Sequence, residues 1–100
     1  MLLEEYNFGR EVLADPGPVL VDFWAEWCPP CRVMNPVVES LAKRFKVCKV
    51  NIDTNQPLAA KFWVEAVPTF LVFKGGQVVK RYQGVTPEAT LRAEMEALSS

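Results

Sequence analysis

The apolar positions of the chain follow a strand-like pattern first and a helix-like pattern next. Residues 19–24 read VLVDFW, a β-branched and aromatic run in which Asp22 is the single charged residue, and such a run predicts a strand buried on both faces of a sheet. From residue 29 onward the apolar residues recur every four positions, which predicts an amphipathic helix over 29–45. Those positions are Val33, Val37, Leu41 and Phe45, flanked by Met34, Val38 and Ala42.

Strand-like and helix-like stretches continue along the rest of the chain. Residues 47–52 predict a second strand, which runs parallel to the first because a helix connects the two. A short helix over 56–62 follows, and residues 67–84 predict a β-hairpin that turns at Gly75-Gly76. The chain is therefore expected to be α/β, with a central mixed β-sheet of four to five strands flanked by helices on both faces.

Each end of the chain also predicts a helix. Near the N-terminus, Asn7 is expected to cap a short helix that ends at the DPGP sequence, after a stub of strand at residues 2–3. Near the C-terminus, Thr86 is expected to cap a helix that begins with Pro87. The core-facing positions of this last helix are Leu91, Met95 and Leu98.

Length and charge narrow the classes of function. One hundred residues, half of them hydrophobic, suffice for one domain over 1–100 with a single core, and a monomer is the default state. Eleven basic residues against twelve acidic ones give a net charge of -1 without a basic run, which argues against a nucleic-acid partner. The N-terminal sequence lacks the positive start and apolar run of a signal peptide, and no stretch reaches membrane-spanning length. We expect a cytoplasmic protein with no membrane partner.

The sequence WCPPC at residues 27–31 is the strongest chemical signal. Cys28 is predicted at the N-cap of the helix with Pro29 at its first position, where unpaired N–H groups and the helix dipole favour a thiolate over a thiol. Cys28 is therefore the candidate nucleophile. Cys31 lies one turn further in, close enough to close a disulfide and deep enough to be shielded, so it is the candidate resolving thiol that attacks a mixed disulfide.

Two other interpretations of the cysteines stay open. The pair could be inert core thiols, or half of a zinc site, because its spacing also matches that of metal ligands. A closed four-ligand site would need carboxylates or a second chain, since the sequence has no histidine and its only other cysteine is Cys48. Cys48 lies in a predicted strand and is expected to be a buried small hydrophobe. We predict no metal and no cofactor.

Asp22 is the most informative single residue, because a carboxylate within VLVDFW is expected to be buried. Burial disfavours the charged form of a carboxyl group and raises its pKa, so Asp22 is expected to take and return protons near neutrality. Lys49, on the neighbouring predicted strand, is placed to pair with it. An edge-strand aspartate that points into water is the alternative.

Taken together, these stretches resemble the thioredoxins. The segments VDFWAEWC, PPCR with Pro36 after it, KVNID, VPTFLVFKGG and YQGV occur in the order and approximate spacing of that family, over essentially the whole chain. The resemblance implies a thioredoxin fold and dithiol/disulfide chemistry. Two departures stand out. Pro29-Pro30 replaces the usual Gly-Pro, as in tryparedoxins and nucleoredoxins, and Trp63 stands where a small or turn-forming residue is usual.

The resemblance also implies roles for individual residues. Asp22 would exchange a proton with Cys31 through water, while Lys49 tunes the carboxyl group in a coupled titration. Pro68 would follow a cis peptide bond and pack against the cysteines. A target strand would pair with the backbone of a substrate groove and approach closely where the groove has a glycine. The groove residues are Trp27, Val67, Pro68 and Gly84.

The leading hypothesis is a protein-disulfide reductase. It would accept electrons from a thioredoxin reductase or an equivalent donor and pass them to disulfide-containing proteins. A thiol oxidant or disulfide isomerase is the alternative within the same chemistry, and the reduction potential separates the two. A redox-inert scaffold that uses the groove only for binding is an alternative of another class.

Overall fold

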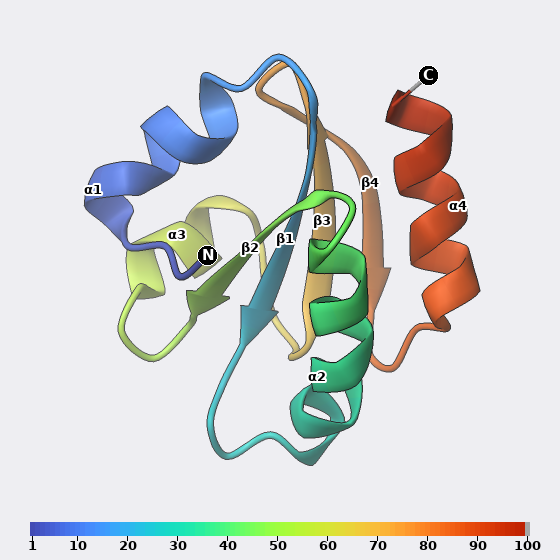
Figure 1. Cartoon of the computed structure of the whole chain (residues 1–100). Helices are drawn as coiled ribbons and strands as arrows, with labels where there is room; N and C mark the ends of the chain where they lie inside the picture. Colours follow the sequence, from blue (N-terminus) through green and yellow to red (C-terminus); the bar gives the residue numbers. More distant parts are fainter. Residues whose placement is uncertain (100) are drawn as a thin grey trace.

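In the computed structural model of the protein, which describes residues 1–99 and only the backbone of Glu5 and Tyr6, a central sheet has helices on both faces (Figure 1). The elements in chain order are α1 (Glu5–Phe8), the π-helical segment η1 (Gly9–Leu13), β1 (Pro18–Trp24), α2 (Pro29–Ala42), β2 (Lys46–Asn51), α3 (Gln56–Lys61), β3 (Thr69–Lys74), β4 (Gln77–Gln83) and α4 (Glu88–Ser99). The predicted order of strands and helices is confirmed.

The sheet is mixed, as predicted. Its four strands lie in the order β2-β1-β3-β4, with β2 parallel to β1 and with β3 antiparallel to both β1 and β4. The parallel pair follows from the α2 crossover, which returns the chain to the same end of the sheet. Leu2 forms an additional parallel bridge to Lys49, which confirms the predicted stub of strand.

Strand β1 lies at the centre of the sheet and supplies side chains to both faces, because successive residues of a strand point in opposite directions. Val19, Val21 and Phe23 pack on the face covered by α1, η1 and α3, whereas Leu20 packs on the face covered by α2 and α4. We call these the α1/α3 face and the α2/α4 face. Asp22 follows the alternation of Leu20 and therefore belongs to the α2/α4 face.

The hairpin between β3 and β4 turns at the predicted glycines. Gly75 and Gly76 have φ angles of 60° and 78°, the left-handed conformation that a two-residue turn of type I′ requires at both positions. A Cβ atom on Gly76 would also lie 2.6 Å from the carbonyl oxygen of Leu13. Conformation and space therefore both favour glycine at residue 76.

Two predicted helix caps are wrong. Helix α1 begins at Glu5, so Asn7 lies inside it, where its Oδ1 accepts a hydrogen bond of 2.8 Å from the Glu4 amide. Helix α4 begins at Glu88, and the Thr86 hydroxyl donates to the Gly84 carbonyl at 3.1 Å instead of capping the helix. In both places a short polar side chain had more than one backbone partner within reach, and a sequence pattern does not choose between them.

The predicted apolar stripe of α2 is shifted. Val33 is 61% exposed, and the buried positions of the helix are Cys31, Met34, Val38 and Leu41. An α-helix advances about 100° per residue, so a strict four-residue repeat drifts by about 40° at each step. Val33 therefore leaves the face that Val38 and Leu41 share.

Candidate functional site

The two cysteines of WCPPC lie where β1 passes into α2. Cys28 is the N-cap of α2 with an extended backbone, and Pro29 occupies the first turn, where its missing N–H leaves no helical hydrogen bond unmade. Cys28 and Cys31 form a disulfide, with their Cα atoms 5.3 Å apart. The Cys31 amide also donates to Cys28 Sγ at 3.1 Å. Amide donors and the dipole at a helix N-terminus favour a thiolate over a thiol.

Burial does not distinguish the two sulfur positions in the disulfide form. Cys31 is 5% exposed, which confirms the prediction that it is shielded, and Cys28 is buried as well, at 2%. Both residues lie in one small cluster with Ala25, against which Val67 packs. What separates Cys28 from Cys31 is the helix cap.

Asp22 is buried, as predicted, with an exposed fraction of 2%. Its burial raises the pKa of the carboxyl group to about 7, against a smaller lowering by the positive charge of Lys49. Its Oδ1 has no hydrogen-bond partner among the described residues. A buried, unpaired carboxyl group that titrates near neutrality suits proton transfer, and it costs the fold stability when it is charged.

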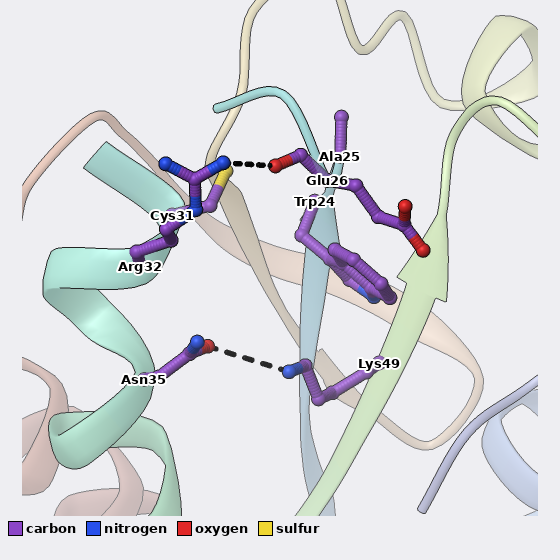
Figure 2. A pocket seen from close by; sticks show the side chains of 7 residues that line it. All are labelled: Trp24, Ala25, Glu26, Cys31, Arg32, Asn35 and Lys49. Atoms are coloured by element: carbon purple, nitrogen blue, oxygen red, sulfur yellow. Dashed lines mark hydrogen bonds between the residues drawn. The ribbon is translucent and has the colours of Figure 1, made fainter. Parts of the chain in front are cut away.

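Lys49 lies beside Asp22 in the parallel register of β1 and β2, as predicted, but the two side chains form no ion pair. The Lys49 ammonium instead donates to Asn35 Oδ1 at 3.4 Å, and its Nζ lies 4.9 Å from the centre of the Trp24 ring. Figure 2 shows these groups around a cavity of about 440 Å³ that Cys31 also lines. The cavity thus joins a cysteine of the disulfide to the lysine that influences Asp22.

The predicted groove residues fall into two sets. The Val67-Pro68 peptide bond is cis, as the resemblance implied, and the Gly84 amide donates to the Pro68 carbonyl at 2.8 Å. Val67 packs against the cysteines, and neither of its backbone polar groups has a hydrogen-bond partner among the described residues. A backbone left unpaired beside a disulfide is available to an incoming strand.

Trp27 is the remaining predicted groove residue and lies apart from the other three. Trp27 is 63% exposed, and its Nε1 donates to Asp53 Oδ2 at 3.0 Å. It borders a separate hollow of about 510 Å³ together with Glu26 and Thr54. An exposed indole directly before Cys28 offers an apolar contact surface at the entrance to the disulfide.

Sequence reasoning missed Asn35 and did not name Trp24 as a site residue. Asn35 follows Cys31 by one helical turn, so its position on α2 was the available signal. Trp24 lines the cavity and its ring faces the Lys49 ammonium. The contacts of Asn35 and Trp24 with Lys49 are not visible in the sequence, because Lys49 lies on a different element, β2.

Cys48 is separated from the disulfide by the sheet. It is fully buried in the α1/α3 cluster, and burial raises the pKa of its thiol. The predicted role as a small buried hydrophobe is confirmed. Within the part of the chain that the structure describes, no group of three or more potential metal ligands comes together. A zinc site built from the three cysteines would therefore require a different fold.

Comparison with known proteins agrees with this geometry. Residues 1–97 match the Thioredoxin family. The chain is 45% identical to Thioredoxin 1 of Nostoc sp. over 94 residues, which cover 90% of this chain and 88% of the relative. It is 42% identical to thioredoxin of Pseudomonas aeruginosa, with 91% and 88% covered. In residues 1–99, every helix is too short or too polar to cross a membrane.

A solved structure shows the same fold. A mutant thioredoxin from Halobacterium salinarum NRC-1 superposes with a TM-score of 0.93 at 34% sequence identity, and the match covers 100% of this chain and 90% of the other. Sequence, fold and the disulfide at the start of α2 thus agree. The chain belongs to the thioredoxin family, and it is a thiol-disulfide oxidoreductase that uses the Cys28–Cys31 pair.

Proposed function

We propose that the protein reduces disulfide bonds of other proteins, with Cys28 as nucleophile and Cys31 as resolving thiol. The observation that supports these roles is the position of Cys28 at the N-cap of α2, where its sulfur accepts a hydrogen bond from the Cys31 amide. A thiolate stabilised in this way attacks a disulfide faster than a thiol does, because the thiolate is the reactive form.

The reaction has two exchange steps. The Cys28 thiolate attacks one sulfur of the target disulfide, which forms a mixed disulfide and releases the other target sulfur as a thiolate. The Cys31 thiol then loses its proton and attacks the sulfur of Cys28, which closes the Cys28–Cys31 disulfide and releases the second target sulfur. The target gains two electrons from the protein; one proton comes from the Cys31 thiol, and the other comes from solvent when the second target thiolate is protonated.

Asp22 is the proposed proton acceptor for Cys31. Its pKa of about 7 means that it is partly deprotonated at neutral pH and can return the proton after taking it. Both residues belong to the α2/α4 side of the sheet, and Lys49, which lowers the pKa of Asp22, lies on the cavity that Cys31 lines. A water molecule between the two groups would carry the proton from Cys31 to Asp22.

The target is proposed to bind across Val67, Pro68 and Gly84, with Trp27 as a further contact. The unpaired backbone of Val67 supports strand-like pairing with the target, which places the target disulfide at Cys28. Gly84 is left-handed, with φ 79°, and nothing would touch a Cβ atom there. This open space beside the Pro68 carbonyl favours close approach of another chain.

The oxidised pair needs an electron donor, for which we propose a thioredoxin reductase or an enzyme of equivalent chemistry. We propose a monomer in the cytoplasm as the working form, since a reducing compartment maintains the dithiol. The dithiol stores both electrons by itself, so no cofactor is required for the exchange steps.

Trapping the intermediate tests the roles of the two cysteines. A Cys31→Ser variant is expected to form a stable mixed disulfide with a disulfide-bearing protein such as insulin, because the second step has no thiol. Mass spectrometry of peptides should place the bond at Cys28. A Cys28→Ser variant should form no such adduct, and a bond found at Cys48 or at Cys31 instead would overturn the assignment.

The reduction potential tests the direction of electron flow. Pro29 lacks the N–H that another residue at this position would offer to the thiolate. A hydrogen bond to a charged group is worth about 1.5–3 kcal/mol, or roughly 30–65 mV for two electrons. A reducing thioredoxin and the oxidant DsbA differ by about 150 mV. We therefore expect a value within some tens of millivolts of about -270 mV in a glutathione or dithiothreitol titration, and a value near about -120 mV would identify an oxidant.

A further inference from the structure

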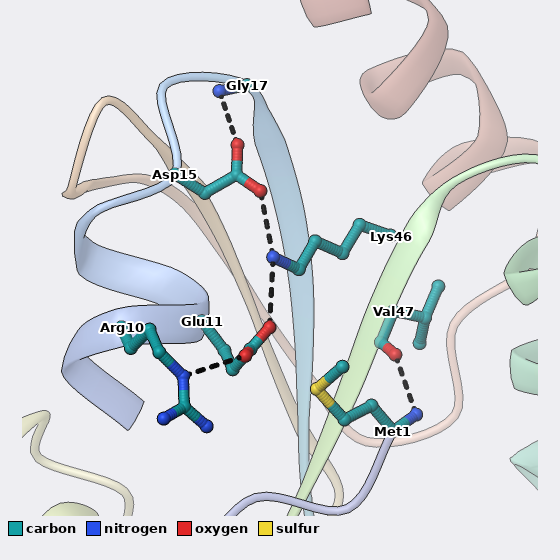
Figure 3. A network of polar contacts seen from close by, with 7 residues as sticks. All are labelled: Met1, Arg10, Glu11, Asp15, Gly17, Lys46 and Val47. Carbon is teal, nitrogen blue, oxygen red and sulfur yellow. Dashed lines mark hydrogen bonds and ion pairs between the residues drawn. The ribbon is translucent and has the colours of Figure 1, made fainter. Parts of the chain in front are cut away.

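Strand β2 carries two lysines whose ammonium groups have opposite surroundings. Lys46 Nζ lies 2.8 Å from Asp15 Oδ2 and 3.4 Å from Glu11 Oε1, so it is held by two carboxylates (Figure 3). Lys49 forms no ion pair with any described side chain, although it is aligned with the buried carboxyl group of Asp22. Lys49 thus forms no ion pair although Asp22 lies beside it on the neighbouring strand, whereas Lys46 forms two.

The contacts of Lys49 explain this difference. Asn35, on α2, offers Oδ1 to the Lys49 ammonium at 3.4 Å, and the Trp24 ring lies beneath the ammonium at 4.9 Å (Figure 2). An amide oxygen and an aromatic face are both favourable partners for a cation. They hold the ammonium at the cavity, while Asp22 Oδ1 remains without a partner among the described residues.

Few other charges act on Asp22. Helix α2 brings Cys31, which is in the disulfide, and β3 places Phe70 opposite Asp22. Helix α4 contributes the apolar Leu91 and Met95 to this side of the sheet. Glu26 and Arg32 stand at the cavity, where the Arg32 guanidinium donates to the Glu26 carbonyl at 2.8 Å. Of all these groups, the Lys49 ammonium is the one whose charge acts on the carboxyl group of Asp22.

We infer that Asn35 is a positioning residue for the redox reaction: its side-chain amide holds the Lys49 ammonium against the Trp24 ring and away from the Asp22 carboxyl group. The inference rests on the proposed role of Asp22 as proton acceptor and adds a residue that controls it. Asn35 belongs to the helix that carries both cysteines, one turn beyond Cys31, so the helix that carries the thiols also holds the lysine.

Releasing Lys49 would change the chemistry of Asp22. A lysine side chain has four rotatable methylene groups, and once free of the amide it can turn toward the unpaired carboxyl oxygen. An opposite charge within about 4–6 Å lowers the pKa of a carboxyl group by about 1–3 units. Asp22 would then stay deprotonated at neutral pH and return its proton poorly. Asn35 therefore keeps the carboxyl group in its useful range by preventing an ion pair.

Titration of Asp22 in the disulfide form tests this inference without turnover. The pH dependence of the ¹³Cγ chemical shift of Asp22 would be followed in the wild type and in Asn35→Ala, with Asp22→Asn used to assign the signal. Asn35 is exposed, so alanine preserves the helix. We expect the midpoint to fall by about 1 unit or more in Asn35→Ala. An unchanged or raised midpoint would overturn the inference.

Two further variants separate positioning from a general effect on α2. Val33→Ala changes an exposed residue of the same helix and should leave the midpoint of Asp22 unchanged. In a Lys49→Met background, Asn35→Ala should have no effect, because the proposed action passes through the ammonium group. A shift of the same size without Lys49 would refute the positioning role.

The proposed function and this inference fail in distinguishable ways. If Asp22 is not the proton acceptor of Cys31, the midpoint still moves in Asn35→Ala while the pH profile of insulin reduction stays where it is. If Asn35 does not hold Lys49, the midpoint stays and the mixed disulfide at Cys28 still forms in Cys31→Ser. The titration alone decides the role of Asn35.

Discussion

Each face of the sheet buries a cluster of apolar side chains, but Cys48 on one face and Asp22 on the other have different surroundings. On the α1/α3 face, Cys48 is fully enclosed by a cluster that includes Phe8 and Phe73. On the α2/α4 face, Asp22 is just as inaccessible to solvent, yet its oxygen lacks a partner and Lys49 acts on it from the cavity beside the disulfide. Burial therefore leaves the Cys48 thiol inert, whereas it makes the Asp22 carboxyl group titrate near neutral pH.

This difference shows that residue type does not decide reactivity in the protein. Cys48 and Cys28 are both buried cysteines, but Cys48 lies within a strand among apolar neighbours, whereas Cys28 accepts an amide hydrogen bond at a helix N-terminus. Apolar surroundings raise the pKa of a thiol, and a helix N-terminus lowers it. The surroundings of each cysteine, and not its residue type, thus distinguish Cys48 from Cys28.

Truncating an aromatic residue of the α1/α3 face should produce the largest effect. Phe73 is 1% exposed and packs edge-on against Phe62 at 5.3 Å between ring centres. Phe73→Ala should lower the free energy of unfolding by about 3–5 kcal/mol in urea, because it leaves a cavity. The reduction potential of the folded variant should stay within error of the wild type, and a large shift would break the division between the faces.

Asp22→Asn should change the pH dependence of stability. The folded protein holds the Asp22 proton to a pKa of about 7, while the unfolded chain releases it near 3.8, so the folded state binds more protons between these values. The stability of the wild type should therefore fall as pH rises from 4 to 7, by up to about 4 kcal/mol relative to Asp22→Asn. Urea unfolding of both proteins across this range measures the difference, and parallel curves would contradict the buried, unpaired carboxyl group.

Cys48→Ala should give a moderate effect on stability and none on chemistry. Removing a buried sulfur from the α1/α3 cluster should lower the unfolding free energy by about 1–2 kcal/mol. Insulin reduction and the potential of the Cys28–Cys31 pair should be unchanged, since the sheet separates the residues. A change in turnover after correction for the folded fraction would show that the faces are coupled.

Trp63→Gly should give the smallest effect, in the stabilising direction. Trp63 follows α3 with φ 57° and is 76% exposed, and its neighbours Phe62 and Val64 pack on the α1/α3 cluster. A left-handed conformation costs a residue with a Cβ atom about 1–2 kcal/mol, and glycine avoids this cost. Part of the gain is cancelled because glycine has more conformational freedom in the unfolded chain.

The matched variant Trp63→Ala isolates that cause. Alanine keeps the Cβ atom and removes the ring, so it should bring no gain, whereas glycine should raise the unfolding free energy by about 0.5–1 kcal/mol. Equal stabilities of the two variants would mean that the backbone of residue 63 is not strained. The Arg81 guanidinium, which donates to the carbonyls of Phe62 and Trp63, holds this helix end in either variant.

Most of the fold could be predicted because its signals are local. The period of apolar residues separates β1 from α2, Gly75-Gly76 marks the hairpin, and the burial of Asp22 follows from its apolar neighbours on the same strand. The errors lie where several local partners compete, as at Asn7 and Thr86. Such choices differ by fractions of a hydrogen-bond energy, which a pattern of residue types does not resolve.

By itself, the sequence determined the order of strands and helices, the cysteine at a helix N-cap and a carboxyl group inside a buried strand. The tertiary structure alone decided which partner Lys49 takes, because Asn35 and Trp24 reach it from other elements. It also decided that Cys48 lies on the opposite side of the sheet from the disulfide. A long flexible side chain has many rotamers of similar energy, and groups distant in the chain select among them only after folding has brought them together.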